Sequence, residues 1–335
     1  MNWMDHESYL EIKPPQVFSF EECLVFLNRS DLEILHQIVD GVIYKFIKAE
    51  KEFMLLKISY TPHSIQVEFP LSSPSESARK AAAAYVWEWF DMGQDLPSFY
   101  EAACRCDIMK RLVYKYNGLR MVCMPDLFEA LIWAIIGQQI NLTFAYTLKK
   151  RFVEHFGECL AFEGRKFWLF PSYERIASID IEDLKKLQFT NRKAEYIIGV
   201  AKVMSDGKIT KGSLQQKNDY QQAKQALMAI RGVGAWTADY VLMKCLHYNC
   251  AFPIADVGLH NALKQQMRLE RKPTLEEINH IAANWQDWQA YATFYLWRSL
   301  YEKSANRTEG QGICSNEISR DKEPLPASHL IYIRL

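Results

Sequence analysis

A short glycine-containing turn is the first feature that could do chemistry. Residues 230–243, "IRGVGAWTADYVLM", place two glycines around a valine and then begin an apolar helix. Because glycine tolerates positive φ and close contact, the amides of Gly232, Gly234 and Ala235 can point outward together at a helix N-terminus. Such amides bind an anion, and a nucleic-acid phosphate suits them without a large basic patch. An ordinary tight turn between two helices explains the same glycines equally well.

A single acid follows this turn. Asp256, in "AFPIADVGLHNALKQQ", comes 22 positions after Gly234 (256 − 234). An aspartate before an apolar helix is most often an N-cap. The intervening helix is nevertheless long enough to bring the chain back beside the turn, so the carboxylate can also lie in a cleft next to whatever the amides hold. The spacing therefore indicates one acid near a bound backbone.

The hydrophobic pattern divides the chain into parts that must position these groups. Residues 42–69 alternate in three short β-rich pieces, which predicts a small antiparallel sheet, and "SPSESARKAAAAYVWEWFDM" predicts a capped helix that covers it. We assign residues 1–100 to this α+β unit. Strand signals nearly vanish afterwards, and recurring helical periodicity predicts an all-helical body over residues 101–303. The polar segment 304–335 is interpreted as a disordered tail.

Composition limits the kinds of partner. Lys+Arg and Asp+Glu are both 40 among 335 residues, so the net charge is zero and any DNA binding must be local. The eight cysteines show no repeated C-x-x-C spacing, and we interpret them as reduced, structural thiols without a metal. The N-terminus lacks the pattern of a signal peptide, and no apolar run approaches the roughly 18 residues of a membrane span. We expect a soluble, cytoplasmic protein that does not enter a membrane.

Several segments together resemble one family. The sequence "IRGVGAWTADYVLM" followed by "FPIADVGL" resembles the helix-hairpin-helix and downstream aspartate of the DNA glycosylase superfamily that contains endonuclease III and 8-oxoguanine glycosylase. The match extends to "LFEALIWAIIGQQI", "LQFTNRKAEYIIGVAKVMSDGKI" and "WQDWQAYATFYLWRSL", and it is nearest to the inducible bacterial 3-methyladenine (type II) branch. This resemblance implies an α+β fold in which a TATA-protein-like sheet domain precedes two helical lobes with the active site between them.

The resemblance implies a catalytic role for Asp256. A carboxylate beside the anomeric carbon stabilises an oxocarbenium-like sugar or orients the attacking water. An N-alkylated purine already carries positive charge and leaves without an acid, so one carboxylate is enough. We therefore expect release of alkylated purines, such as 3-methyladenine and 7-methylguanine, from double-stranded DNA.

Two branches of the family are expected not to apply. The branch that also nicks the strand places a lysine two residues after the last hairpin glycine, where this chain has Trp236, and Lys244 lies about two helical turns further on. This favours a monofunctional enzyme without lyase activity. The iron–sulfur branch needs four late cysteines, and only Cys314 follows Asp256. No cofactor is expected, apart from a monovalent cation that hairpin carbonyls hold in this family.

Aromatic side chains are candidates for binding a base that has been rotated out of the duplex. Trp236 and Tyr240 are spaced i, i+4 and share a helix face, and Trp297 aligns with a third pocket aromatic of the alkyladenine branch. Such rings hold a cationic purine by stacking and cation–π attraction. Packing in the hydrophobic core is the alternative for each ring.

The gap left by the rotated base must be filled. Gln138 and Gln139, in "IIGQQINL", lie at a turn between two apolar helices, where an amide could enter the base stack. Gln139 takes the place of an apolar wedge in the nearest relatives, and capping of the helix junction is the alternative role. The expected partner is double-stranded DNA with damaged bases, and no obligate protein partner is expected.

Two other functions remain open. One is a helix-hairpin-helix module that binds DNA without catalysis, and the other is a glycosylase for an oxidised or deaminated base. A pure DNA-binding module has no use for a carboxylate between aromatic rings, so Asp256 with Trp236 and Tyr240 favours the enzyme. A neutral lesion gains less from cation–π stacking than a cationic one, so substrate competition separates the two enzyme hypotheses.

Overall fold

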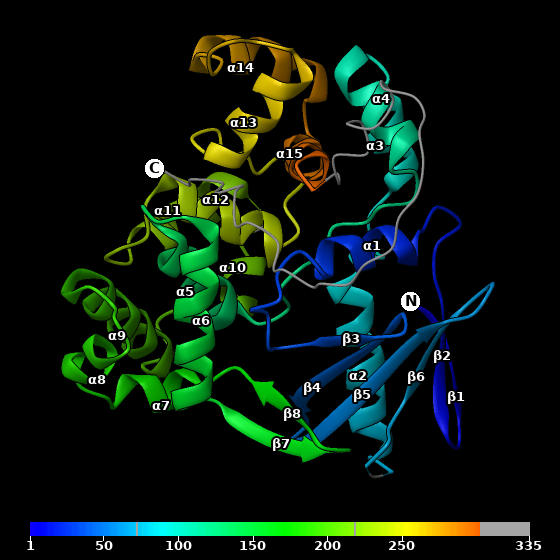
Figure 1. Cartoon of the computed structure of the whole chain (residues 1–335), viewed down its shortest axis with the longest axis vertical. Helices are drawn as coiled ribbons and strands as arrows, with labels where there is room; N and C mark the ends of the chain where they lie inside the picture. The colour runs from blue at the N-terminus through cyan, green and yellow to red at the C-terminus, as the bar shows by residue number, and fades with distance from the viewer. Residues whose placement is uncertain (72, 218, 302–335) are drawn as a thin grey trace, which may run out of the picture.

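The computed structural model describes residues 1–71, 73–217 and 219–301 (Figure 1). It has an N-terminal antiparallel sheet and a larger helical part, so the predicted α+β class is confirmed. The predicted tail at residues 304–335 lies outside the described residues. The predicted domain boundary at residue 100 falls inside helix α3 (Leu96–Ala103), and the division into domains stays a prediction.

The sheet has six strands in the order β1-β2-β6-β5-β4-β3, and each neighbouring pair is antiparallel. The strands are β1 (Asn2–His6), β2 (Tyr9–Lys13), β3 (Gln37–Val39), β4 (Val42–Ala49), β5 (Glu52–Tyr60) and β6 (Ile65–Glu68). β4, β5 and β6 are the three predicted pieces. The sequence analysis missed β1, β2 and β3. β1 has no buried residue and β3 is only three residues long, so neither shows clear alternation, and β2 alternates over only five residues.

Helix α2 (Glu76–Trp89) covers the sheet, as predicted (Figure 1). Ser75 is its N-cap and accepts a hydrogen bond from the Ala78 amide at 3.3 Å. The helix buries three alanines, Ala78, Ala82 and Ala83, together with larger side chains such as Trp89. Helix α1 (Phe20–Leu27) lies between β2 and β3 in the chain.

The rest of the described chain is mainly helical. Its helices are α3 (Leu96–Ala103), α4 (Asp107–Lys115), α5 (Leu127–Gly137), α6 (Leu142–Phe156), α7 (Tyr173–Ala177), α8 (Ile181–Lys186), α9 (Asn191–Ser205), α10 (Lys211–Gln215), α11 (Tyr220–Met228), α12 (Ala235–Lys244), α13 (Val257–Gln266), α14 (Leu275–Ala282), the 3-10 helix η1 (Ala283–Trp285) and α15 (Gln289–Ser299). The long predicted helices are confirmed.

A β-hairpin inside this part contradicts the expectation of an all-helical body. Strands β7 (Glu158–Phe162) and β8 (Arg165–Leu169) form a two-stranded sheet that lies beside β4 (Figure 1). Phe167 of β8 is buried with Phe46 and Leu55 of the N-terminal sheet. The hairpin is stabilised by this distant surface, which local periodicity cannot show.

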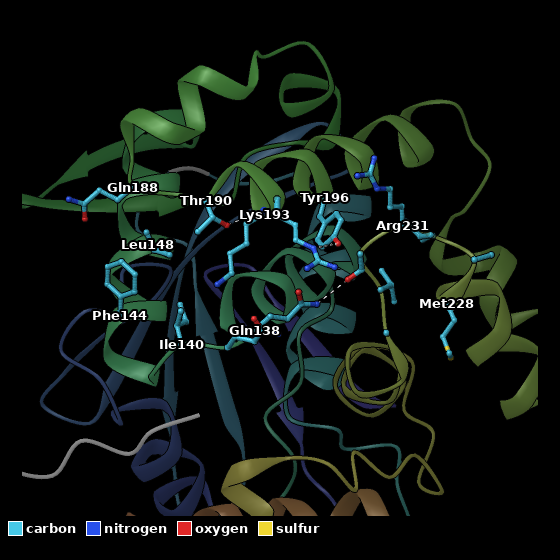
Figure 2. A pocket seen from close by; sticks show the side chains of 17 residues that line it. Gln138, Ile140, Phe144, Leu148, Gln188, Thr190, Lys193, Tyr196, Met228 and Arg231 are labelled. Atoms are coloured by element: carbon cyan, nitrogen blue, oxygen red, sulfur yellow. Dashed lines mark hydrogen bonds between the residues drawn. The ribbon is translucent and has the colours of Figure 1, made fainter. Parts of the chain in front are cut away.

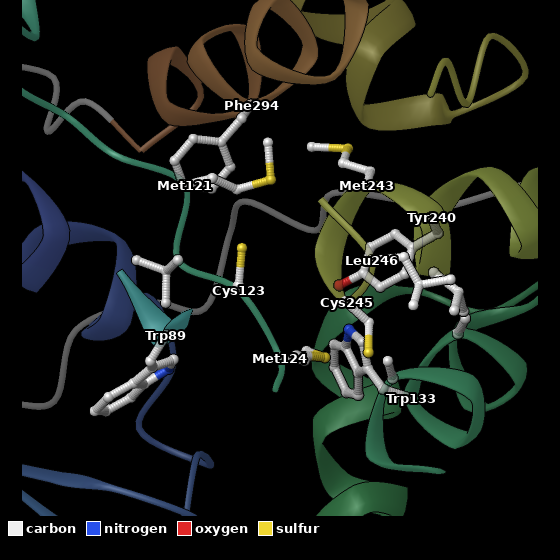
Figure 3. Packing of buried hydrophobic residues seen from close by; sticks show 14 of the residues in the cluster. Trp89, Met121, Cys123, Met124, Trp133, Tyr240, Met243, Cys245, Leu246 and Phe294 are labelled. Carbon is white, nitrogen blue, oxygen red and sulfur yellow. The ribbon is translucent and has the colours of Figure 1, made fainter. Parts of the chain in front are cut away.

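Helix α5 is the centre of the helical core. Every residue of α5 except Glu129 is buried, as expected of a helix that is apolar on all sides. It packs against α6, α9 and α12. Figure 3 shows Trp133 of α5 beside Tyr240 and Cys245, which come from α12 and its end. This packing holds α12 against α5, and the glycine turn lies at the start of α12.

The described residues contain neither a helix that could span a membrane nor a disulfide. None of the helices there is both long and apolar enough to cross a membrane. The seven cysteines in that part of the chain are free thiols, and Cys314 lies outside it.

Candidate active site

Asp256 lies at the start of α13 and is 4 % exposed. As the sequence alternative suggested, it is an N-cap, because its Oδ1 accepts the Leu259 amide at 2.7 Å. It also receives two indole N–H groups. Trp297 Nε1 donates to Oδ1 at 2.7 Å, and Trp236 Nε1 donates to Oδ2 at 3.2 Å. The carboxylate is therefore held by three N–H donors from three helices.

Burial governs the charge of this carboxyl group. Removal from water raises the pKa of Asp256, while the hydrogen bonds from Leu259, Trp297 and Trp236 act to lower it. The net effect is a raised pKa. A carboxylate that is costly to bury but specifically oriented is typical of a functional site.

The three predicted aromatic residues lie together around Asp256. The ring centroids of Trp236 and Tyr240 are 5.5 Å apart, and those of Tyr240 and Trp297 are 6.1 Å apart. With Asp256 they line a cavity of about 90 Å³. This volume is below the roughly 300–1,000 Å³ of drug-sized ligand sites, so a single flat ring system would fill it.

Several residues of this cavity were not singled out from the sequence, among them Gly258, Phe26 and Arg29. Gly258 lies two positions after Asp256, and a Cβ there would be 2.9 Å from Asp256 Oδ1 and 3.1 Å from Trp297 Nε1. Glycine is thus needed for the indole to reach the carboxylate. Phe26 and Arg29 also line the cavity, although they belong to the N-terminal part of the chain. No local motif marks them.

The two glycines of the turn before α12, Gly232 and Gly234, have different roles. Gly232 has φ +96°, and a Cβ on it would lie 2.3 Å from the Tyr196 ring, so this position requires glycine. Gly234 has φ −87° and is the N-cap of α12, so it does not use the positive φ that glycine allows. A Cβ on Gly234 would meet nothing within 4 Å. The amides of Gly234 and Ala235 have no acceptor within the described part of the chain and are available to an anion.

The two glutamines at the α5–α6 turn differ in their hydrogen bonding and exposure. Gln138 donates through Nε2 to the Gly232 carbonyl and to Thr237 Oγ1, both at 3.0 Å, and so links this turn to the turn before α12. Figure 2 shows Gln138 at the edge of the hollow described below. Gln139 is exposed and has φ +57°, a strained conformation for a residue with a side chain. Both line a hollow of about 630 Å³ between the hairpin, the turn and the start of α9.

Two lysines near the site are occupied elsewhere. Lys244, at the end of α12, is buried and donates to the Val122 carbonyl, and burial lowers its pKa to about 7. It does not line the cavity of Asp256. Lys193 donates to the Ile136 carbonyl at 2.6 Å, and burial lowers its pKa to about 8. Its amino group is therefore used inside the protein.

One cluster has the residue types of a metal site. Ligand atoms of Asp91, Cys123 and His247 lie within 4.8 Å of one another. His247, however, contacts carboxylates through both ring nitrogens, Nδ1 with Asp91 at 2.7 Å and Nε2 with Glu88 at 3.1 Å. A ring that donates from both nitrogens is an imidazolium and has no lone pair for a metal. We interpret the cluster as an ion network that joins the end of α2 to the loop after α12.

Comparison with known proteins agrees with this geometry. The HhH-GPD superfamily of base excision DNA repair proteins matches residues 132–287. A DNA-3-methyladenine glycosylase of Bacillus subtilis (strain 168) is 42 % identical over 304 residues, which cover 90 % of this chain and all of the relative. DNA-3-methyladenine glycosylase 2 of Escherichia coli (strain K12) is 28 % identical over 180 residues, which cover 54 % of this chain and 60 % of that protein.

A solved structure shows the same fold. The 3-methyladenine DNA-glycosylase from Archaeoglobus fulgidus superposes with a TM-score of 0.74 at 23 % identity, covering 86 % of this chain and 96 % of the other. This likeness extends over both the sheet and the helical part. The family match and the extent of the Bacillus match show that the chain belongs to the HhH-GPD superfamily of base excision DNA repair proteins.

Proposed function

We propose that this protein is a DNA glycosylase that hydrolyses the bond between an alkylated purine and deoxyribose in double-stranded DNA. One observation carries the proposal: a buried carboxylate lies in a base-sized aromatic cavity and is oriented by two indole N–H groups. The names of its relatives, DNA-3-methyladenine glycosylases, support the same substrate class.

Asp256 acts on the sugar in this mechanism. As the glycosidic bond breaks, positive charge develops on the ring, and the nearby carboxylate stabilises that charge. The carboxylate then accepts a proton from the water that attacks C1′. Hydrogen bonds from Trp236 and Trp297 fix the orientation of Asp256, so little reorganisation is needed at the transition state. This hydrolysis requires no cofactor.

We further propose that the enzyme is monofunctional and of the type II class. Lyase chemistry needs an amine that reaches the sugar carbon. Among the described residues that line the Asp256 cavity there is no lysine, and the position of the family's lysine is occupied by Trp236, whose indole is bonded to Asp256. Lys244 is held by a carbonyl away from the cavity. Water is therefore the nucleophile.

DNA is held at the hairpin and the α5–α6 turn in this proposal. The amides of Gly234 and Ala235 at the start of α12 bind a backbone phosphate, aided by the helix dipole. Gln139, rather than Gln138, enters the base stack, because Gln138 is already bonded to the hairpin while Gln139 is exposed at the turn. A monovalent cation at the hairpin remains a part of the proposal that rests on the family resemblance.

Base release from alkylated duplex DNA tests the function. The intact chain and Asp256→Asn are compared for free methylated purines and for strand breaks before and after alkali. Asparagine keeps an oxygen for the Leu259 amide, so the variant removes charge while it retains the helix cap. We expect the intact chain to release bases and breaks to arise only after alkali. If both proteins bind DNA and neither releases a base, the chain is a DNA-binding module.

A further inference from the structure

A cation from the N-terminal part of the chain lies in the proposed base cavity. Arg29 follows helix α1 and lines the same cavity as Asp256, Trp236 and Tyr240. Its guanidinium carbon is 4.0 Å from the centroid of the Phe26 ring. The cation therefore already occupies an aromatic face of the cavity before any base enters.

The guanidinium of Arg29 has unused donors. Nη1 donates to the Phe26 carbonyl at 2.9 Å, and no carboxylate within the described residues forms an ion pair with this arginine. A guanidinium has five N–H donors, has no acceptor and stays charged in proteins. Donors that are partly removed from water and lack acceptors favour a ligand that brings acceptor atoms or negative charge.

This charge divides alkylated purines into two classes. A base such as 7-methylguanine carries positive charge in DNA and leaves as a neutral molecule. A fixed guanidinium therefore opposes binding of this base and does not stabilise the leaving group as the bond breaks. A neutral lesion such as 1,N6-ethenoadenine must leave with the electron pair of the broken bond. Negative charge then develops on the purine, where a guanidinium stabilises it.

We propose that Arg29 contacts the base and enables the release of neutral alkylated purines, in addition to the action of Asp256 on the sugar. This inference rests on the proposed function and specifies its substrate class. The C1′–N9 bond breaks, and its electron pair stays on the purine, which Arg29 stabilises as an anion. Water adds to C1′ and gives its proton to Asp256, and the released purine takes a proton from solvent.

The test compares two substrates and two Arg29 variants. Single-turnover release is measured for the intact chain, Arg29→Gln and Arg29→Lys, with duplex DNA containing either 1,N6-ethenoadenine or 7-methylguanine. Arg105→Gln is the matched control, because it removes the same charge from an exposed loop position between α3 and α4. Thermal melting of each protein shows whether it is folded.

The decisive quantity is the ratio of the ethenoadenine rate to the methylguanine rate. We expect Arg29→Gln to lower this ratio by about tenfold or more, as for loss of a charged hydrogen bond. Arg29→Lys keeps the charge but loses the planar guanidinium with its several N–H donors, so it should give an intermediate ratio. Arg105→Gln should keep the original ratio. An unaltered ratio in Arg29→Gln, or in Arg29→Lys if the first variant does not fold, overturns the inference. If the intact chain releases neither base, the proposed function itself fails.

Discussion

Replacement of Trp297 by phenylalanine should change the pH dependence of base release. Trp297 Nε1 donates to Asp256 Oδ1 at 2.7 Å, the shorter of the two indole contacts. This hydrogen bond stabilises the carboxylate and counteracts the rise in pKa that burial causes. Phenylalanine keeps a ring in the cavity but has no donor. The variant therefore isolates the hydrogen bond from the packing.

The size of the effect follows from the strength of the lost bond. A hydrogen bond to a charged group contributes about 1.5–3 kcal/mol, and one pKa unit corresponds to about 1.4 kcal/mol. The reaction needs ionised Asp256, so activity falls as pH decreases through its pKa, which burial has already raised. Loss of the donor raises that pKa further. The acid limb of the profile should move to higher pH by about one to two units.

Single-turnover base release between acid and mildly alkaline pH measures this shift. Trp236→Phe should shift the limb less, because its contact of 3.2 Å is longer. Trp168→Phe is the control, since that indole lies on β8 beside the N-terminal sheet and should leave the limb in place. A uniform loss of rate in Trp297→Phe, with the acid limb unmoved, would refute the assigned role of the indole N–H.

Three further substitutions test the geometry around the site. Gly258→Ala should slow base release by about tenfold or more, because its Cβ would push Trp297 from Asp256; parallel melting curves check that the fold is retained. Gln139→Ala should slow release from duplex DNA more than from single-stranded DNA, which has no gap to fill, and equal slowing on both would contradict a wedge role. Gly232→Ala should destabilise the protein by about 1–3 kcal/mol in denaturant unfolding and weaken binding to damaged and undamaged DNA alike.

The parts that the sequence predicted well are local in the chain. The strands β4 to β6 and the covering helix α2 have periodicities that show within one segment. The placement of Asp256 beside the start of α12 also followed from one helix and one loop. The sequence could not show β7 and β8, because the surface they pack on is contributed by the N-terminal sheet more than 100 residues earlier.

The structure brings Asp256, Trp236, Tyr240 and Trp297 together, but the sequence did not indicate all of their contacts. Trp236 and Trp297 were expected to offer ring faces, and the structure shows that they also donate N–H groups to Asp256. That role depends on how α12, α13 and α15 meet, which a sequence pattern does not specify. Arg29 had no motif at all, because its position in the cavity depends on the packing of α1 against the helical part.

The burial of Asp256 distinguishes its role as a helix N-cap from its proposed catalytic role. An N-cap needs only one side-chain oxygen near a helix amide, and caps elsewhere in this chain remain exposed, as Asp219 does at the start of α11. Asp256 is instead removed from water and surrounded by rings, which raises its pKa and makes the ionised form costly at neutral pH. Capping does not require that cost. The proposed catalytic role explains the cost of burying the charge. A sugar cation formed in the cavity beside the charged oxygens interacts with the carboxylate far more strongly than it would in water.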